Sequence, residues 1–250
     1  LTWAADSETF LYVTEDPVTK RHDTLWRMKL GGKPERVLEE KDPLYNIGVG
    51  RTRDRKYIEL GSHSTDTWEV RILEADRPWN AFRVLLPREK GHKYDIDHRD
   101  GLIYIRTNRG AKNFRMVTAP AADPSVKNWK PFIDHRSDVL LQGIDLFKDH
   151  AVVREKSAGL DRLRVLDFAT GAWRDIAFPE SVYTANGAGT PEYDSKLFRY
   201  SYQSMVTPAS IYDFDMAQGR SVLLKRQEVV GGYDPANYAS ERLWATARDG

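Results

Sequence analysis

Five short runs of similar pattern recur along the chain, and their spacing decides the fold. They are FLYVTED (residues 10–16), YIELGSH (57–63), LIYIRTN (102–108), HAVVREK (150–156) and LFRYSYQ (197–203). Their starts are separated by 47, 45, 48 and 47 residues. In each run, apolar positions alternate with polar ones, which is typical of a strand with one face more buried than the other. We therefore predict a strand at the same place in five consecutive repeats.

Two further series of strand-like runs follow the first at the same period. The second series is TLWRMKL (24–30), TWEVRIL (67–73), NFRMVTA (113–119), RLRVLDF (162–168) and SIYDFDM (210–216). The third series is RVLEE (36–40), FRVLLP (82–87), WKPFIDH (129–135), WRDIAFP (173–179) and SVLLKRQ (221–227). A shorter segment precedes most units, as in NIGVGRT (46–52) and YDIDHRD (94–100). Each complete unit therefore contains four short strands.

This pattern predicts an all-β fold, a β-propeller built of four-stranded antiparallel blades. Helical repeats are excluded because no stretch sustains a 3.6-residue period over three turns. The signature of WD40 blades is absent, and an immunoglobulin-like sandwich would not give five copies at one spacing. The expected blades span residues 1–46, 47–93, 94–141, 142–184 and 185–236.

The turns repeat as well. An aspartate precedes the second strand of every unit, at Asp6, Asp54, Asp100, Asp149 and Asp194. We expect these carboxylates to serve the turns, because aspartate accepts hydrogen bonds from nearby backbone N–H groups and tolerates left-handed backbone geometry. A metal or acid-catalysis role is disfavoured, since one carboxylate per repeat would be scattered around a ring. Glycines at the third connection (Gly31, Gly32, Gly171 and Gly219) are expected to supply positive φ.

Composition excludes several classes of protein. The 250 residues are 40% hydrophobic and 30% charged, with no cysteine, which removes disulfides, thiolate zinc sites and cysteine nucleophiles. The 38 basic and 37 acidic residues leave a net charge of +1, so nucleic acid is not an expected partner. The mean hydropathy of −0.61 and the lack of a long apolar run argue against a membrane protein. A cytoplasmic origin is expected.

The two ends of the sequence suggest a piece of a longer protein. The chain opens on Leu1 with neither an initiator methionine nor a signal peptide, and it stops at ATARDG (245–250). The first unit also has only a few residues before the turn at Asp6. We therefore expect a fragment whose first boundary falls inside a blade.

No catalytic constellation is visible in the sequence. A G-x-S-x-G nucleophile elbow is absent. A triad drawn from Ser62, His63 and Asp66 is disfavoured, because neighbours on one strand point to opposite faces. Neither a metal-ligand cluster nor a phosphate-binding glycine loop appears, so no metal and no cofactor are expected.

The densest polar run is HKYDIDH (92–98). Asp95 and Asp97 are expected to share a strand face, because they are two residues apart. Two interpretations of this pair remain open: exposure to solvent, which we favour, and a position facing the central channel of the propeller.

Several stretches spread over the whole chain carry a further signal. They are DPVT (16–19), EKD (40–42), GSHST (61–65), YIRTN (104–108), AKNFR (111–115), LDRLRV (160–165), QEV (227–229), GYDPANY (232–238) and SERLWATARDG (240–250). These stretches, most distinctively those from residue 227 onward, resemble the oligopeptidase B branch of the prolyl oligopeptidase family of serine peptidases.

The resemblance implies a seven-bladed propeller that covers an α/β-hydrolase domain with a Ser–Asp–His triad. The propeller limits the substrates to short peptides, and oligopeptidase B cleaves after Lys or Arg. Five of the seven blades, the third to the seventh, would occupy residues 1–236. Residues 237–250 would form an exit segment leading into the hydrolase domain of the same polypeptide, so no catalytic residue falls within this sequence.

Three acidic residues in or beside the first strands of their units are candidates for the channel or the domain interface: Asp97, Asp145 and Glu192. The expected function is thus the substrate-gating part of a serine-type endopeptidase, inactive by itself. The alternative is a free-standing propeller that serves as a scaffold for protein interactions. A glycosidase propeller is disfavoured, because paired inner carboxylates are not evident.

Overall fold

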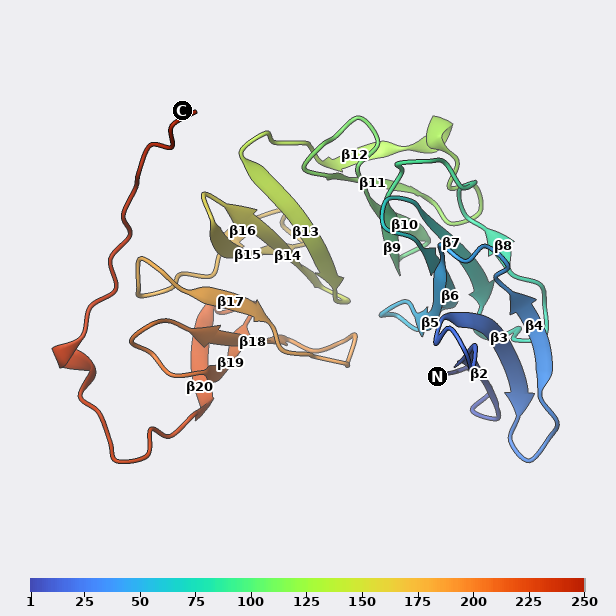
Figure 1. The fold of residues 1–250 in the computed structure, drawn as a ribbon, viewed down its shortest axis with the longest axis horizontal. Coiled ribbons are helices and arrows are strands. Elements are labelled where there is room, and N and C mark those ends of the chain that lie inside the picture. The colour runs from blue at the N-terminus through green and yellow to red at the C-terminus, as the bar shows by residue number, and fades with distance from the viewer. Residues whose placement is uncertain (250) are drawn as a thin grey trace. The chain divides into compact units, whose positions relative to one another are not determined.

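The chain folds into five four-stranded antiparallel sheets (Figure 1), seen in a computed structural model that describes residues 1–249. The first sheet contains β1 (Thr2–Trp3), β2 (Thr9–Glu15), β3 (His22–Lys29) and β4 (Glu35–Glu39), and the second contains β5 (Asn46–Arg51), β6 (Tyr57–His63), β7 (Trp68–Glu74) and β8 (Arg83–Val84). The third contains β9 (Tyr94–Arg99), β10 (Leu102–Thr107), β11 (Arg115–Pro120) and β12 (Lys130–Ile133). The fourth contains β13 (Val139–Leu146), β14 (His150–Ser157), β15 (Leu160–Asp167) and β16 (Trp173–Asp175), and the fifth contains β17 (Thr184–Gly187), β18 (Leu197–Gln203), β19 (Ser210–Asp215) and β20 (Arg220–Arg226).

Within every sheet the strands lie side by side in the order of the sequence. Two 3₁₀ turns complete the secondary structure, η1 (Val126–Asn128) and η2 (Pro235–Asn237). This is the arrangement of propeller blades, so the predicted all-β fold is confirmed. The strands divide between two compact units: Leu1–Ser137 carries the first three sheets, and the chain from Asp138 onward carries the last two.

Alternation along the strands determines which face of a sheet is buried. On β6, Ile58 and Leu60 are fully buried and pack with Leu11 and Leu25 of the first sheet. Each such side chain contributes about 2 kcal/mol of hydrophobic stabilisation. Two other apolar clusters fill the layers between the second and third sheets and between the fourth and fifth sheets.

Arginine side chains join neighbouring sheets through backbone carbonyls. Three of them, here called the inter-sheet arginines, reach the connection between the third and fourth strands of the next sheet. Arg27 donates to the carbonyls of Pro78 at 2.6 Å and Asn80 at 3.1 Å, Arg83 to that of Ala121 at 2.7 Å, and Arg174 to that of Ala217 at 3.4 Å. Because charged donors form strong hydrogen bonds, these contacts link each sheet to the next one.

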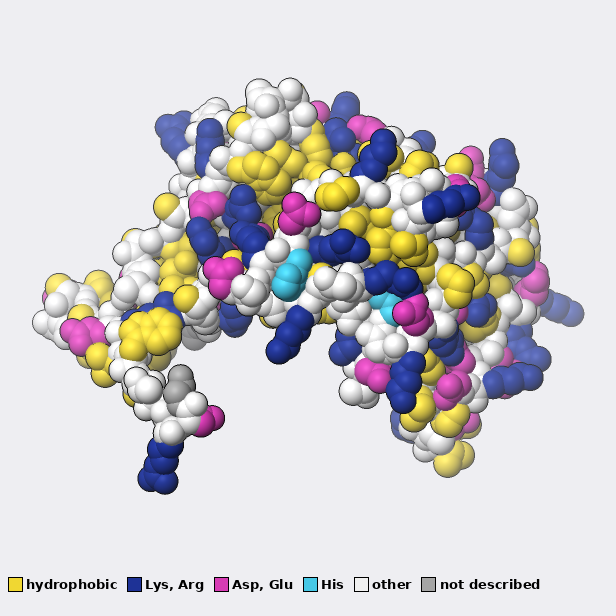
Figure 2. Space-filling model, turned by 90° about the horizontal axis from the view of Figure 1, so that it is seen from above, with side chains coloured by type: hydrophobic (Ala, Val, Ile, Leu, Met, Phe, Trp, Pro, Cys, Tyr) yellow, Lys and Arg dark blue, Asp and Glu magenta, His cyan; other side chains and the backbone are white. Residues whose placement is uncertain are grey.

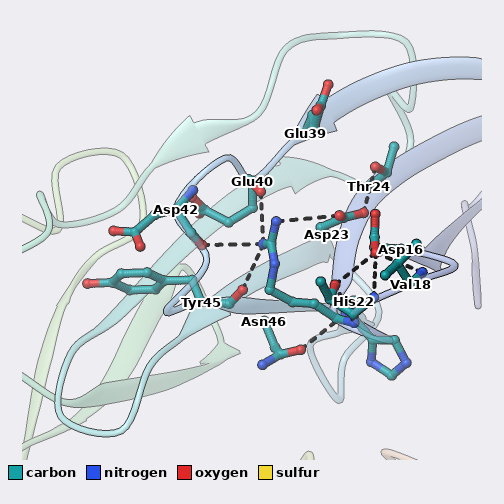
Figure 3. Close-up of polar contacts among 12 residues, drawn as sticks. Asp16, Val18, His22, Asp23, Thr24, Glu39, Glu40, Asp42, Tyr45 and Asn46 are labelled. Atoms are coloured by element: carbon teal, nitrogen blue, oxygen red, sulfur yellow. Dashed lines mark hydrogen bonds and ion pairs between the residues drawn. The ribbon is translucent and has the colours of Figure 1, made fainter.

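A fourth arginine fixes the connection that leads from the first sheet to the second. The Nη1 atom of Arg21 donates to the carbonyl oxygens of Glu40 at 2.9 Å, Asp42 at 3.3 Å and Tyr45 at 3.0 Å (Figure 3). The connection therefore curls around one guanidinium group.

The turn aspartates behave only in part as predicted. Asp6 accepts hydrogen bonds from the backbone N–H groups of Glu8 and Thr9, and Asp54 accepts one from Lys56. Asp100 shows the other predicted property, the left-handed conformation, with φ of 50°. The carboxylate of Asp149 instead forms an ion pair with Lys196 at 3.0 Å. The predicted positive φ at the third connection is confirmed at Gly31, Gly171 and Gly219 and is wrong for Gly32.

The fourth strand of the second sheet is shorter than the run FRVLLP suggests. It contains only Arg83 and Val84, after which Leu85 and Leu86 are buried between the second and third sheets. The backbone N–H of Leu85 still donates to the carbonyl of Val70 at 2.9 Å, so contact with β7 continues one residue beyond the strand.

Candidate functional site

Asp97 lies on β9, the first strand of the third sheet, and is only 8% exposed. Its Oδ1 atom accepts hydrogen bonds from the backbone N–H groups of Arg53 at 2.9 Å and His98 at 2.8 Å. Burial raises the pKa of Asp97 to about 6, although these two hydrogen bonds oppose the rise. The solvent-exposed interpretation is therefore wrong for Asp97, because the turn before β6 in the second sheet covers its side chain.

The next residue, His98, joins the same two sheets. Its Nδ1 atom lies 2.5 Å from Oδ2 of Asp54, and both side chains are buried. Burial by itself would raise the pKa of Asp54, but the hydrogen bonds from His98, Lys56 and Thr52 lower it by more. The pKa of Asp54 therefore lies below its ordinary value. The His98 ring also forms a T-shaped contact with Tyr57, with ring centroids 4.9 Å apart.

A cavity of about 290 Å³ opens between the second and third sheets, beside these contacts. Its polar lining consists of Glu59, His63 and Asp95, and its other walls include the glycines Gly48, Gly50 and Gly61. Burial, together with the negative charges of Asp97 and Asp95, raises the pKa of Glu59 to about 7. Burial lowers the pKa of His63, which is therefore neutral near pH 7.

The other two candidates from the sequence lie in the second unit. Asp145 is on β13, where its Oδ2 atom forms an ion pair with Nε of Arg154 at 3.2 Å. Gly187 of β17 lies alongside, because a Cβ atom there would be 3.8 Å from the same Asp145 oxygen. Glu192 is exposed in the loop that follows β17. The hydrogen bond and charge of Asp213 raise the pKa of Arg199, and the charge of Glu192 adds a smaller contribution.

The side chains of the disfavoured triad do not assemble. Ser62 is buried, whereas His63 lies on the opposite face of β6, where its ring contacts Trp68. Asp66 accepts a hydrogen bond from Thr67. Across residues 1–249, no group of three or more His, Asp or Glu side chains is arranged to hold a metal ion.

Glu59 is the site residue that the sequence reasoning missed. The available signal is the alternation of β6, which places Glu59, Gly61 and His63 on the face opposite the buried Ile58 and Leu60. A polar and glycine-rich face between two packed sheets indicates a gap in the apolar layer.

The surface carries mixed charge. On the face shown in Figure 2, basic and acidic side chains are interspersed, without a large area of one sign. In the described part of the chain, no helix has the length and apolarity needed to cross a bilayer.

Comparison with known proteins identifies the family. Residues 1–227 match the family model described as the prolyl oligopeptidase N-terminal β-propeller domain. The dipeptidyl aminopeptidase BI of Pseudoxanthomonas mexicana is 40% identical over 100% of this chain and 35% of its own length.

Two solved structures of oligopeptidase B are similar over 99% of the chain. The enzyme from Leishmania major has a TM-score of 0.89 at 31% identity, and the closed form from Trypanosoma brucei, with covalently bound antipain, has a TM-score of 0.91 at 29% identity. The chain covers 36% and 37% of these two proteins and thus spans about a third of their length. The resemblance seen in the sequence is confirmed, and the chain belongs to the N-terminal β-propeller family of the prolyl oligopeptidases.

Proposed function

We propose that this chain is the substrate-gating propeller of a serine-type oligopeptidase. The observation that carries the proposal is the family match over residues 1–227, together with relatives about three times as long as the chain. A propeller over a catalytic cavity admits short peptides and rejects folded proteins. Closure also keeps bulk water away from the reaction, as lids do in other enzymes.

The proposed partner is an α/β-hydrolase domain of the same polypeptide, which would carry the Ser–Asp–His triad. In this proposal residues 1–236 form the incomplete propeller and residues 237–250 lead into the hydrolase domain; residue 250 lies outside the described residues. After β20 the chain runs on as an extended segment interrupted by η2 (Figure 1). Leu243 and Trp244 are largely exposed there, which is expected of side chains that a further domain covers.

Cleavage after Lys or Arg is the proposed specificity. It is supported by the similarity to two oligopeptidase B structures, one of which holds covalently bound antipain. The name of the Pseudoxanthomonas relative instead describes removal of dipeptides. An endopeptidase and a dipeptidyl aminopeptidase are therefore the two modes of cleavage that an assay must separate.

The three acidic candidates take different roles in this proposal. Glu192 is exposed and Asp145 is partly exposed, so both are proposed to meet peptide or the hydrolase domain directly. Asp97 is buried, so its proposed influence on the channel is through its negative charge.

The test uses the protein encoded by the intact gene. Short peptides with Lys or Arg before the scissile bond are compared with citrulline and norleucine analogues, and with a folded protein that bears the same sequence. We expect cleavage that serine-directed inhibitors abolish, with selection for short basic peptides. Equal cleavage of the folded protein would refute gating, and equal cleavage of the neutral analogues would refute the Lys/Arg specificity.

The alternative function, a free-standing interaction scaffold, predicts a different result. The reading frame after residue 250 would then lack a G-x-S-x-G elbow followed by Asp and His. The intact protein would cleave none of these peptides.

A further inference from the structure

The apolar layer between the second and third sheets is interrupted at the edge formed by β5 and β9. Farther along the sheets, this layer is filled by side chains such as Ile72, Leu86 and Ile105. At β5, two of the positions that face the gap are glycines, Gly48 and Gly50. In propellers, the sheets surround a central channel, and the first strand of each blade lines it. The cavity therefore opens beside β5 and β9, the first strands of two neighbouring sheets.

The glycines keep this cavity open. A Cβ atom on Gly50 would lie 3.3 Å from Oε1 of Glu59, and one on Gly61 would lie 2.6 Å from Cε1 of His63. A Cβ atom on Gly48 would meet no atom within 4 Å. Gly50 and Gly61 thus leave space for the carboxylate of Glu59 and the imidazole of His63, and Gly48 borders open space.

Glu59 has no counter-charge of its own. Among residues 1–249, its side chain makes neither a hydrogen bond nor an ion pair. The neighbouring Asp95 is bound by Arg106, whose Nε atom donates to Oδ2 of Asp95 at 2.8 Å. Asp97 adds negative charge near Glu59, while His63 stays neutral. A carboxylate that is half-buried without a partner favours a cationic group beside it.

We propose that this cavity, walled by Gly48, Gly50 and Gly61 with Glu59 as its anion, is a subsite for one cationic group of a peptide. The ligand is an alkylammonium or guanidinium group, from a Lys or Arg side chain or from the peptide's N-terminus. A space of about 290 Å³ suits a single side chain, since drug-sized ligands need roughly 300–1,000 Å³. This inference rests on the proposed function only in taking the ligand to be a peptide.

Direct binding is the first test, and it requires no catalysis. n-Butylammonium and n-butylguanidinium are titrated into the intact protein by calorimetry, with n-butanol as the neutral probe. If the subsite exists, both cations should bind, n-butanol should not bind, and Glu59→Gln should weaken cation binding about tenfold. Gly48→Leu, which fills the cavity from its open wall, should abolish binding. Glu74→Gln, at an exposed position of the same sheet, is the matched control and should bind as the unaltered protein does.

The pH dependence gives an independent readout. The pKa of Glu59 is about 7, so cation binding should strengthen between about pH 6 and pH 8 in the unaltered protein. The change should be much smaller in Glu59→Gln, where the neighbouring Asp97, with a pKa of about 6, still titrates. Thermal unfolding of each variant shows whether it is folded. Equal cation binding by the unaltered protein and by folded Glu59→Gln, or equal binding of butanol, would overturn the proposal.

Peptides then identify the source of the cation. Pairs that differ by Lys against norleucine, Arg against citrulline, or a free against an acetylated N-terminus are compared for KM with each variant. For one of these pairs, the difference in KM between its two peptides should be smaller in Glu59→Gln than in the unaltered protein, and that pair identifies the group that occupies the cavity. If Glu59→Gln leaves the KM difference of all three pairs unchanged, the cavity is not a peptide subsite. Failure of the proposed function appears separately, as no inhibitor-sensitive cleavage by the unaltered protein.

Discussion

Glu59 should make the protein less stable against unfolding as the pH rises. Burial, followed by repulsion from Asp97 and Asp95, raises the pKa of Glu59 from 4.5 to about 7. A carboxyl group with a raised pKa binds more protons in the folded state than in the unfolded chain between these two values. The free energy of unfolding therefore falls as the pH rises through this window and stays low above it.

The substitution Glu59→Gln isolates this effect, because it keeps the shape of the side chain and removes its charge. The shift corresponds to about 3 kcal/mol when the carboxyl group is fully ionised. The carboxyl group borders a cavity that admits water, so we expect about 2 kcal/mol in practice. Glu59→Gln should thus stabilise the protein by about this amount near pH 8.5 and have little effect near pH 4.5.

The assay is thermal unfolding of the intact protein and the variant at both pH values, with Glu74→Gln as the exposed control. Hydrogen exchange of the β5 and β9 amides shows whether the gain in stability lies at the junction of the second and third sheets. Lower stability of Glu59→Gln near pH 8.5, or an equal gain at both pH values, would refute the reasoning. A gain in stability accompanied by weaker cation binding would show that the cavity trades stability for function.

Three further substitutions test contacts between and within the sheets. Arg27→Met removes two hydrogen bonds to carbonyls of the second sheet and an ion pair. It should lower the free energy of unfolding, measured with denaturant, by about 2–4 kcal/mol. A decrease below about 0.5 kcal/mol would contradict the role of this side chain. Asp54→Asn removes the charged partner of His98 and should cost about 1–2 kcal/mol at neutral pH. The pKa of Asp54 is lowered in the folded state, so the difference in unfolding free energy between the two proteins should disappear as the pH falls below this lowered pKa. A difference that does not change with pH would contradict the lowered pKa. Gly219→Ala places a Cβ atom at φ of 72° and 1.9 Å from Nη1 of Arg174, and should lower the melting temperature; an unchanged melting temperature would mean that the turn relaxes freely.

The sequence predicts the sheets well because their signal is local. Alternation of apolar and polar residues in each run depends on neighbours within the same strand, and the 47-residue period repeats it five times. The positive φ at Gly31, Gly171 and Gly219 is equally local, because glycine alone satisfies such turns without strain.

The candidate site is much harder to predict, because it depends on residues from two sheets. Asp97 has a polar side chain on an alternating strand, and only the turn containing Arg53 shows that it is buried. The cavity beside Glu59 likewise requires three glycines from two strands to lie opposite β9. Contacts between residues about 40 positions apart leave no periodic signal in a single sequence.

The inter-sheet arginines have a consequence for how the blades tolerate change. Arg27, Arg83 and Arg174 bind backbone carbonyls of the following sheet, and every amino acid supplies a carbonyl. The receiving blade can therefore exchange its side chains at these connections without losing the contact, provided that the loop keeps its path. Only the donor position is restricted to arginine. Replacing the connection between the third and fourth strands of a sheet by one of the same length but different sequence should leave the arginine–carbonyl hydrogen bonds intact. These loops are therefore suitable places to introduce new surface side chains.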